Sequence, residues 1–205
     1  MEKKDRKAHW EKIYSTKQLN EVSWYQPTPD TSITFLKDSN LPKDAAIIDV
    51  GGGDSFFVDY LVEEGYSNVT VLDISERAIE RAKFRLGVDA SKVTWLTYDV
   101  NDFLPSTIYD FWHDRAAFHF LTNPTEIKQY KETVESAVKP NGHVVIGTFS
   151  KTGPLKCSGI EITQYSHSDL IQLFDSFQIV TDLEVKHGTP FDTTQDFIFC
   201  HFLNK

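Results

Sequence analysis

The chain carries the stretch Ile-Ile-Asp-Val-Gly-Gly-Gly-Asp-Ser at residues 47–55. Its apolar first half predicts a short buried strand, and its three glycines predict a tight turn. Apolar residues then recur at helical spacing between Phe56 and Leu61, so we expect a helix after the turn. Glycine at such a turn lets the backbone approach a ligand without an intervening side chain. The stretch therefore predicts a strand, a turn and a helix, with a ligand held at the turn.

The rest of the chain repeats this alternation of short apolar strands and amphipathic helices. Strands alternating with helices predict a parallel sheet with helices on both faces. The last two strands are joined by a loop too short for a helix, which favours an antiparallel hairpin at the end of the sheet. Residues 1–42 are predicted to form an N-terminal helical cap or lid over a domain that spans residues 43–205. We expect strands at residues 45–50, 68–72, 93–98, 109–112, 143–148, 178–186 and 195–203.

Capping residues mark several helix starts. Ser75 and Ser166 precede amphipathic stretches and are predicted N-caps. The stretch Asn-Pro-Thr-Glu at residues 123–126 predicts a start in which Asn123 caps the helix and the proline occupies its first position. In that arrangement Glu126 bonds back to the cap.

The composition limits the kinds of partner that the protein is expected to bind. The 205 residues contain 21 Lys and Arg against 30 Asp and Glu, so the formal net charge is −9 and the pI is near 5.2. This charge argues against binding nucleic acid on a broad basic surface, because neutralising phosphates takes clustered cations. No apolar run approaches the roughly 18 residues of a membrane span, and the first residues lack the apolar core of a signal peptide. Cys157 and Cys200 have no metal-binding spacing. We expect a cytoplasmic protein without a metal, a nucleic-acid partner or a membrane partner, and no oligomeric state is assigned.

Acidic residues stand at the ends of the first three predicted strands, at Asp49, Asp73 and Asp99. Each alone fits an ordinary turn acid or helix cap, and Asp102 is a rival to Asp99. An acid about 20 residues beyond the turn can accept hydrogen bonds from ribose hydroxyls, and a third can accept one from an adenine amine. The pattern G-x-G-x-x-G needs glycine where Phe56 stands, and no P-loop motif occurs. A carboxylate beside the turn repels a pyrophosphate, so the acids together predict a pocket for a positively charged nucleoside.

Five segments resemble, in order and spacing, those of class I S-adenosylmethionine-dependent methyltransferases, in particular small bacterial proteins of the methyltransferase-domain type. This resemblance runs from about Trp24 to the final strand and implies a three-layer αβα sandwich. Its Rossmann-like, mostly parallel sheet has seven strands in the order 3-2-1-4-5-7-6, and the last strand is antiparallel. The family often has a third glycine where Ser55 stands, so the turn is expected to be slightly less tight here. The segments are IIDVGGGDS, VTVLDIS, LTYDVNDF, YDFWHDRAAFHFL and VKPNGHVVIGTFS.

The resemblance implies S-adenosyl-L-methionine as the cofactor and indicates where it lies. Gly51 and Gly53 are expected to line its methionine side, Asp73 its ribose, and Asp99 with Val100 its adenine. Further contacts come from the lid, the strand ends and the segment after the fourth strand. The full set of expected cofactor-binding residues is Trp24, Asp49, Gly51, Gly53, Asp73, Ile74, Asp99, Val100, Asp114 and Arg115.

Methyl transfer from a sulfonium is an in-line displacement, so alignment matters most and a base is needed only for a protonated acceptor. His119 is the candidate base, although a histidine between two phenylalanines also fits a core position. Asp114 is a candidate to orient the base or contact the cofactor. Arg115 is expected either to pair with Asp114 or to bind a substrate carboxylate. Cys157 lies where the family inserts substrate loops, and it lacks an activating partner for a nucleophilic role.

The function predicted from these residues is methyl transfer to a small polar or carboxylate-bearing molecule. The alternatives are a protein-lysine methyltransferase and a non-catalytic module that binds S-adenosylmethionine. Phe56 argues against a third possibility, an NAD-linked oxidoreductase.

Overall fold

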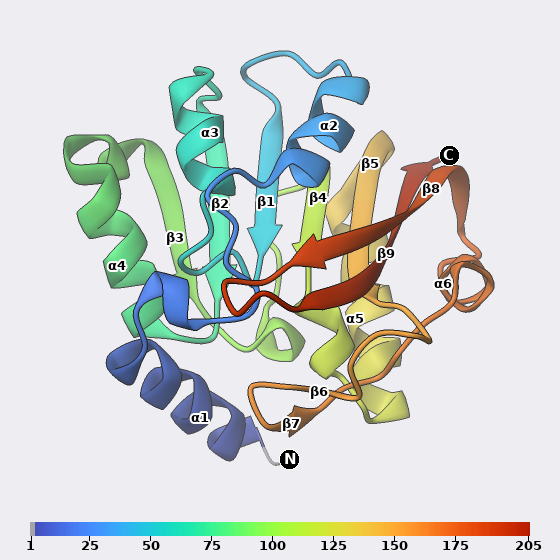
Figure 1. Ribbon diagram of the computed structural model, residues 1–205. Coiled ribbons are helices and arrows are strands. Elements are labelled where there is room, and N and C mark those ends of the chain that lie inside the picture. The colour runs from blue at the N-terminus through green and yellow to red at the C-terminus, as the bar shows by residue number, and fades with distance from the viewer. Residues whose placement is uncertain (1–2) are drawn as a thin grey trace.

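The computed structural model describes residues 3–205 and shows one seven-stranded sheet flanked by helices (Figure 1). The strand order is β3-β2-β1-β4-β5-β9-β8, which confirms the predicted order because the two extra numbers belong to a separate short hairpin. All neighbours from β3 to β5 are parallel, whereas β9 is antiparallel to both β5 and β8. The strands are β1 (Ala46–Val50), β2 (Asn68–Asp73), β3 (Val93–Thr97), β4 (Tyr109–Arg115), β5 (Val138–Phe149), β8 (Phe177–Gly188) and β9 (Thr194–Asn204).

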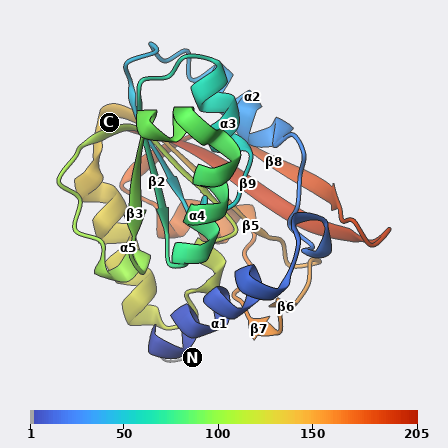
Figure 2. The ribbon, with the colours of Figure 1, turned by 90° about the vertical axis from the view of Figure 1, so that its left-hand side faces the viewer.

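Helices cover both faces of the sheet, and Figure 2 shows α5 on one side of β2 and β3 and α3 with α4 on the other. The α-helices are α1 (Lys3–Thr16), α2 (Asp30–Asp38), α3 (Phe57–Glu63), α4 (Glu76–Leu86), α5 (Pro124–Ala137) and α6 (His167–Leu173). No helix among the described residues is both long and apolar enough to cross a membrane.

Strand β1 is buried along its whole length and divides the core in two. Ile48 packs in a cluster with residues of α5 and α6, whereas Ile47 packs in a second cluster with residues of α2 and α3. Successive side chains of a strand point to opposite faces, so Asp49 shares the α2 side with Ile47. This alternation places an acid beneath α2 at the carboxyl end of the sheet.

The predicted caps of three helices are present. Ser75 accepts a hydrogen bond from the Ala78 N–H at the start of α4, and Ser166 forms a capping box at the start of α6. Asn123 caps α5 with Pro124 in its first turn. The prediction for Glu126 is wrong, because its carboxylate binds Arg6 of α1 instead of the cap.

The N-terminal residues divide between the lid and the core. Helix α1 crosses the edge of the sheet at which β1 ends, in the lower part of Figure 1, and faces the short hairpin of β6 (Lys156–Cys157) and β7 (Ile160–Glu161). Helix α2 instead packs its buried residues Ile33, Phe35 and Leu36 against α3 and the sheet. Of the described residues before β1, those that line the cavity described below, Arg6, Trp10, Tyr14 and Trp24, all precede α2.

Candidate active site

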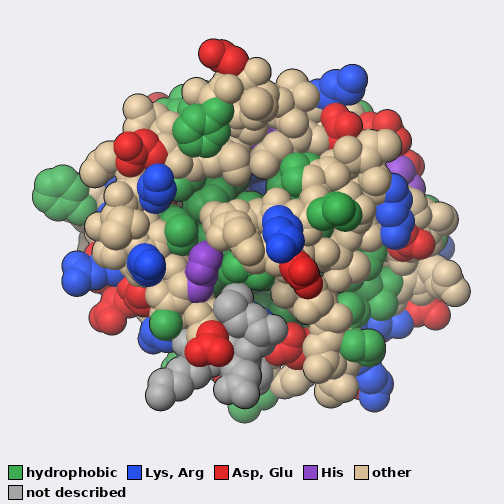
Figure 3. Space-filling model, turned by 60° about the horizontal axis from the view of Figure 1, so that its bottom comes forward, with side chains coloured by type: hydrophobic (Ala, Val, Ile, Leu, Met, Phe, Trp, Pro, Cys, Tyr) green, Lys and Arg blue, Asp and Glu red, His purple; other side chains and the backbone are tan. Residues whose placement is uncertain are grey.

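A cavity opens at the carboxyl ends of β1, β2, β3 and β4, beneath α1. Five residues predicted from the glycine turn and the strand ends line it: Asp49, Gly51, Asp73, Ile74 and Asp99. Val100, Trp24 and Arg115 line it as well. Figure 3 views the molecule from this side, and hydrophobic side chains show in the recess near the middle of the face.

The glycine turn is shaped by the two acids beside it. Gly51 has φ +68, and a Cβ there would lie 2.5 Å from the Cβ of Ala117. Gly53 has φ +33, and a Cβ there would lie 2.5 Å from Asp73 Oδ2. A side chain at Gly52 would collide with the Asp49 carboxylate. The turn therefore needs glycine because of both its backbone conformation and its contacts.

Asp49 is held by a histidine that the sequence analysis did not select. His113 lies directly opposite Asp49 in the neighbouring strand, and its Nδ1 donates to Asp49 Oδ1 at 2.6 Å. Its Nε2 lies 2.8 Å from the hydroxyl of Ser32 in α2. The other carboxylate oxygen, Oδ2, is buried and has no hydrogen-bond partner among the described residues. An unpartnered buried carboxylate oxygen in a cavity can accept a hydrogen bond from a ligand's amine.

The strand β4 is longer than predicted, and this explains why His113 was missed. Tyr109–Arg115 forms the strand, so His113 and Asp114 continue it instead of starting the following loop. His113 is 2% exposed and packs between Phe57 and Phe111. An alternation of side chains through the whole segment would have placed His113 on the same face as Phe111.

Asp73 occupies the end of β2, as predicted for a ribose-binding acid. Its Oδ1 accepts a hydrogen bond from the Ser75 N–H at 2.7 Å. Burial, together with the nearby charges of Asp49 and Glu11, raises the pKa of Asp73 to about 7 against the lowering effect of the Ser75 hydrogen bond. The carboxyl group is therefore poised between its two protonation states near neutral pH.

Asp99, the predicted adenine-binding acid, is joined to the lid. Its Oδ2 forms an ion pair with Arg6 Nη1 at 3.0 Å, and its Oδ1 accepts a hydrogen bond from the Asn101 N–H. Arg6 also reaches both carboxylate oxygens of Glu126 at 2.9 Å. The first turns of α1 are thus attached to the segment just after β3 and to the start of α5.

Asp114 and His119, the predicted catalytic pair, do not line the cavity. Asp114 lies on the opposite face of the sheet, fully buried, and accepts hydrogen bonds from Ala117 N–H, Phe118 N–H and the Tyr130 hydroxyl. Burial raises the pKa of Asp114 to about 6. Its carboxylate therefore braces the turn after β4 and makes no contact with His119.

His119 is buried among aromatic rings on the side of the sheet that α2 and α3 cover, which is opposite to the side of Asp114. Its Nδ1 accepts a hydrogen bond from the Phe149 N–H at 3.3 Å, and its ring contacts Phe120 and Phe149. Burial lowers the pKa of His119 to about 3, so the imidazole is neutral and weakly basic. This is the core position that the sequence left open as the alternative to a base.

Four aromatic side chains form a wall of the cavity beneath the lid. Trp10 is central: its ring lies 5.0 Å from Phe120, 5.7 Å from Trp24 and 6.1 Å from Tyr14, measured between centroids. Aromatic faces attract cations such as a sulfonium and also pack against flat apolar groups. Cys157 lies beside this wall, and burial raises its pKa to about 12, so it remains a thiol.

Three side chains from β4, β8 and β9 fix the segment between the lid and α2. Arg115 donates to the backbone oxygen of Trp24, which excludes the alternative that it pairs with Asp114. His187 Nε2 donates to the backbone oxygen of Ser23 at 2.7 Å, and Gln195 donates to the Ser23 hydroxyl at 3.2 Å. The β8–β9 hairpin thus positions the segment around Ser23 that precedes α2.

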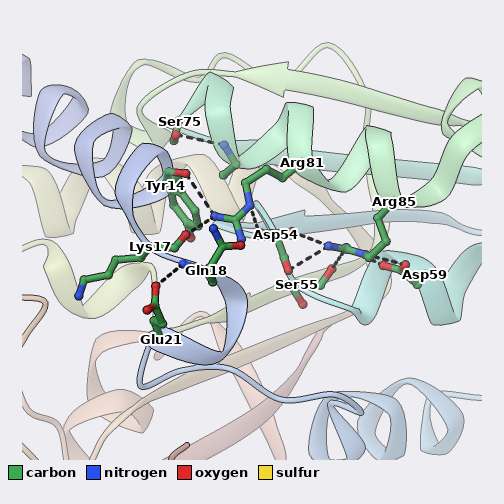
Figure 4. Close-up of polar contacts among 11 residues, drawn as sticks. Tyr14, Lys17, Gln18, Glu21, Asp54, Ser55, Asp59, Ser75, Arg81 and Arg85 are labelled. Carbon is green, nitrogen blue, oxygen red and sulfur yellow. Dashed lines mark hydrogen bonds and ion pairs between the residues drawn. The ribbon is translucent and has the colours of Figure 1, made fainter.

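Two arginines of α4 brace the lid and the glycine turn from the opposite side (Figure 4). Arg81 donates to the backbone oxygens of Tyr14 and Lys17 and forms an ion pair with Asp54 at 2.8 Å. Arg85 binds Asp54 and reaches the backbone oxygen of Ser55 at 2.8 Å. The helix after β2 therefore holds both the end of α1 and the glycine turn.

Comparison with known proteins assigns the chain to a family. Residues 41–189 match the family model of the methyltransferase domain, which is more than half of the chain, so the protein belongs to that family. This match and the observed strand order confirm the resemblance and the fold predicted from the sequence.

Relatives in the family differ in their substrates. The chain is 28% identical over 157 residues to EEF1A lysine methyltransferase 2 of Danio rerio, covering 68% of this chain and 66% of that protein. It is 22% identical over 162 residues to the ubiquinone biosynthesis O-methyltransferase of Rickettsia conorii, covering 74% and 55%. The chain therefore spans less than two thirds of the length of these curated relatives.

Solved structures share the fold. The N-methyltransferase NodS of Bradyrhizobium japonicum WM9, crystallised with S-adenosyl-L-homocysteine, superposes with a TM-score of 0.73 at 16% identity. The superposition covers 97% of this chain and 98% of that one. At this identity the likeness establishes the architecture alone.

Proposed function

We propose that the chain is a methyltransferase that uses S-adenosyl-L-methionine. The observation that carries this proposal is the meeting of the glycine turn with the unpartnered Oδ2 of Asp49 and the carboxyl group of Asp73 in one cavity. An acidic end suits an ammonium group, and a second acid one strand away suits ribose hydroxyls. The membership of the chain in the methyltransferase domain family supports the same cofactor.

The residues that would hold the cofactor follow from their positions. Asp49 Oδ2 would accept the methionine amine, and Gly51 and Gly53 would let the backbone approach the methionine side. Asp73 with Ile74 would hold the ribose. The adenine would lie beside Asp99 and Val100, and Trp24 would close the cavity from the lid.

When bound, S-adenosylmethionine supplies a methyl group to an acceptor lone pair, the carbon–sulfur bond breaks with its electrons left on sulfur, and neutral S-adenosylhomocysteine results. The protein contributes alignment and exclusion of water, which account for about 7–11 kcal/mol of barrier in well-oriented reactions. The aromatic wall of Trp10, Tyr14, Trp24 and Phe120 would exclude water from the reacting atoms. Asp114 and His119 stay predictions as catalytic residues, and either would need a rearrangement to reach an acceptor.

The acceptor we favour is a small polar or carboxylate-bearing molecule. The net charge of −9 disfavours nucleic acid as a substrate. A lysine of a basic protein is the second candidate, and the likeness to a lysine methyltransferase supports it. The two candidates differ in the charge that they bring to the cavity.

A reducing compartment suits the two cysteines of the chain. Cys157 and Cys200 are both free and buried, which is the usual state of cysteines in such a compartment. We therefore propose a cytoplasmic location.

Calorimetry with S-adenosylmethionine and S-adenosylhomocysteine tests the proposed cofactor. We expect both to bind with micromolar affinity, NAD not to bind, and Asp73→Ala to abolish binding. Asp38→Ala, which removes an exposed acid of α2, is the matched control and should bind as the parent protein does. Absence of binding by both adenosyl ligands would refute the proposal. Binding without methylation of any acceptor would favour the non-catalytic module.

A further inference from the structure

Arg115 is a cation without an acidic partner in the described part of the chain. Its Nη1 and Nη2 both donate to one acceptor, the Trp24 backbone oxygen, at 3.2 and 3.1 Å. The other buried or half-buried arginines each pair with a carboxylate: Arg6 at 3.0 Å, Arg81 at 2.8 Å and Arg85 at 2.7 Å. A guanidinium has five N–H donors, so Arg115 retains donors for an anion.

The position of Arg115 sets it apart from the predicted cofactor contacts. In β4 it pairs with Gly147 of β5 and, unlike the four residues before it, has no partner in β1. Its guanidinium lies 5.6 Å from the ring centroid of Phe197 in β9 and close enough to His187 of β8 to lower the pKa of that imidazole. These strands carry none of the residues of the glycine turn or the ribose site. Arg115 therefore lies at the end of the cavity that is left for the acceptor.

The acids nearest to Arg115 form no ion pair with it among the described residues. Asp49 is bonded to His113 through Oδ1, and Asp114 is occupied on the opposite face of the sheet. Burial lowers the pKa of Arg115 to about 10 against the raising effect of the Asp49 charge, so the side chain stays protonated at neutral pH. A desolvated cation without a directly bonded carboxylate is unfavourable, and an anionic ligand would relieve part of that cost.

Flat apolar surface adjoins this charge. Trp24 and Phe120 both contact Trp10, and all three line the same cavity as Arg115. Phe197 supports the guanidinium from the sheet. A bidentate anion such as a carboxylate fits the planar guanidinium, and an apolar or aromatic body fits the adjoining rings.

We infer that Arg115 binds the carboxylate of the acceptor, and that the acceptor is a small organic acid with an apolar or aromatic body. This inference rests on the proposed methyltransferase function. It separates the two candidate substrates, because a lysine ammonium would place a further cation beside Arg115 and the sulfonium. Of the roles that the sequence left open for Arg115, it selects the substrate carboxylate over the cofactor contact.

The test compares carboxylates with neutral molecules of the same shape. The protein is first saturated with S-adenosylhomocysteine, and benzoate, phenylacetate, hexanoate and their primary amides are titrated in by calorimetry. Arg115→Met removes the charge and keeps the packing volume, and Arg115→Lys keeps the charge without the planar fork. Arg77→Met, at an exposed position of α4, is the matched control.

We expect at least one carboxylate to bind the parent protein at least 10-fold more tightly than its amide. Arg115→Met should reduce the carboxylate to the affinity of the amide, Arg115→Lys should retain part of the preference, and Arg77→Met should retain all of it. Equal affinities for acid and amide in the parent protein would overturn the inference, and so would the failure of all three acids to bind.

A second comparison separates the acceptor from the cofactor's own carboxylate. S-adenosylhomocysteine and 5′-methylthioadenosine, which lacks the amino-acid portion, are titrated into the parent protein and into Arg115→Met. We expect any loss of affinity that comes from the missing Trp24 contact to be the same for both ligands, and binding of either ligand also shows that the variant is folded. A loss of at least 10-fold for S-adenosylhomocysteine alone would assign Arg115 to the cofactor and refute the inference. Failure of both ligands to bind the parent protein would instead refute the proposed function.

Discussion

Asp73 is the residue whose charge state most directly couples the site to pH. Its pKa of about 7 is raised by burial, and ribose hydroxyls that donate to the carboxylate would lower it again. Cofactor binding should therefore release a proton near pH 6.5, and affinity should rise with pH up to about 7 and then level off. Calorimetry in two buffers of different ionisation enthalpy measures the proton count.

Two controls sharpen this prediction. Proton release should vanish at pH 8.5, where Asp73 is already ionised, and in Asp73→Asn, which cannot ionise. Proton uptake on binding at pH 6.5 would contradict it.

Tyr130 is the residue that stabilises the buried carboxylate of Asp114. Its hydroxyl donates to Asp114 Oδ2 at 2.7 Å and accepts from Trp112 Nε1 at 3.1 Å. Tyr130→Phe breaks both bonds within the core, so we expect a loss of about 1.5–3 kcal/mol in the free energy of unfolding by urea. Affinity for S-adenosylhomocysteine should be unchanged, because neither Tyr130 nor Asp114 lines the cavity.

A change of Tyr66, whose ring packs against Lys43, controls for the loss of a hydroxyl. Tyr66→Phe should cost much less than Tyr130→Phe. Equal costs for the two variants would show that the Asp114 network contributes little to stability.

Single residues also mark the limit of prediction from sequence. The acids Asp49, Asp73 and Asp99 could be placed because each follows a recognisable strand. His113 could not be recognised as the partner of Asp49, since that contact depends on the register of β1 against β4. That Asp114 lies away from the cavity could not be recognised either, because its location depends on which face of β4 the side chain occupies.

The glycine turn is the element in which backbone conformation and ligand contact can be separated. Gly53→Ala places a methyl group against Asp73, whereas Gly65→Ala, also at positive φ, meets nothing within 4 Å. Both variants should lose about 1–2 kcal/mol of stability from left-handed backbone strain. Only Gly53→Ala should weaken the binding of S-adenosylhomocysteine in calorimetry, by at least 10-fold. Equal affinities for the two variants would contradict the assignment of the turn to the ligand.

Helix α1 is the element that one ion-paired arginine attaches to the site. Arg6→Gln leaves Asp99 and Glu126 without their cation, so we expect the amide hydrogens of α1 to exchange faster with deuterium. Lys7→Gln, at an exposed position of the same helix, should leave the exchange unchanged. Slow exchange in Arg6→Gln equal to that of the parent protein would show that the aromatic packing and the Arg81 hydrogen bonds are sufficient to hold the lid.

Elements whose signals are local were predicted well. Ser166 and Asn123 cap their helices as expected because an N-cap involves only the next few residues. Glu126 differs because its partner, Arg6, lies 120 positions away in the sequence. The β6–β7 hairpin was not predicted, because the sequence indicated there only the place where the family inserts substrate loops.

The whole molecule should respond to the ligand, because the cavity is lined by the N-terminal segment, the glycine turn and the carboxyl ends of the central strands. At 100 times its dissociation constant, a ligand that binds only the folded state adds about 2.7 kcal/mol. For a chain of this size that corresponds to a rise of about 5–10 °C in Tm with S-adenosylhomocysteine. Differential scanning fluorimetry measures the shift, which should be absent with NAD and in Asp73→Ala. A shift retained in Asp73→Ala would place the ligand elsewhere.

For the molecule as a whole, the sheet topology was predictable because the alternation of strands and helices restricts the possible strand orders. The short final loop indicated the antiparallel hairpin, and the structure confirms it. What the hairpin does for the site was not predictable, since His187 and Gln195 act on Ser23, more than 160 residues earlier.

The aromatic wall has an optical consequence. Two of the four tryptophans of the chain, Trp10 and Trp24, line the cavity, whereas Trp112 is completely buried in the core and Trp95 lies in β3. Occupancy of the cavity should therefore alter the intrinsic ultraviolet emission of the protein through indoles that a ligand touches. The molecule carries its own fluorescent reporter, and unlabelled compounds can be screened by emission intensity in a plate reader.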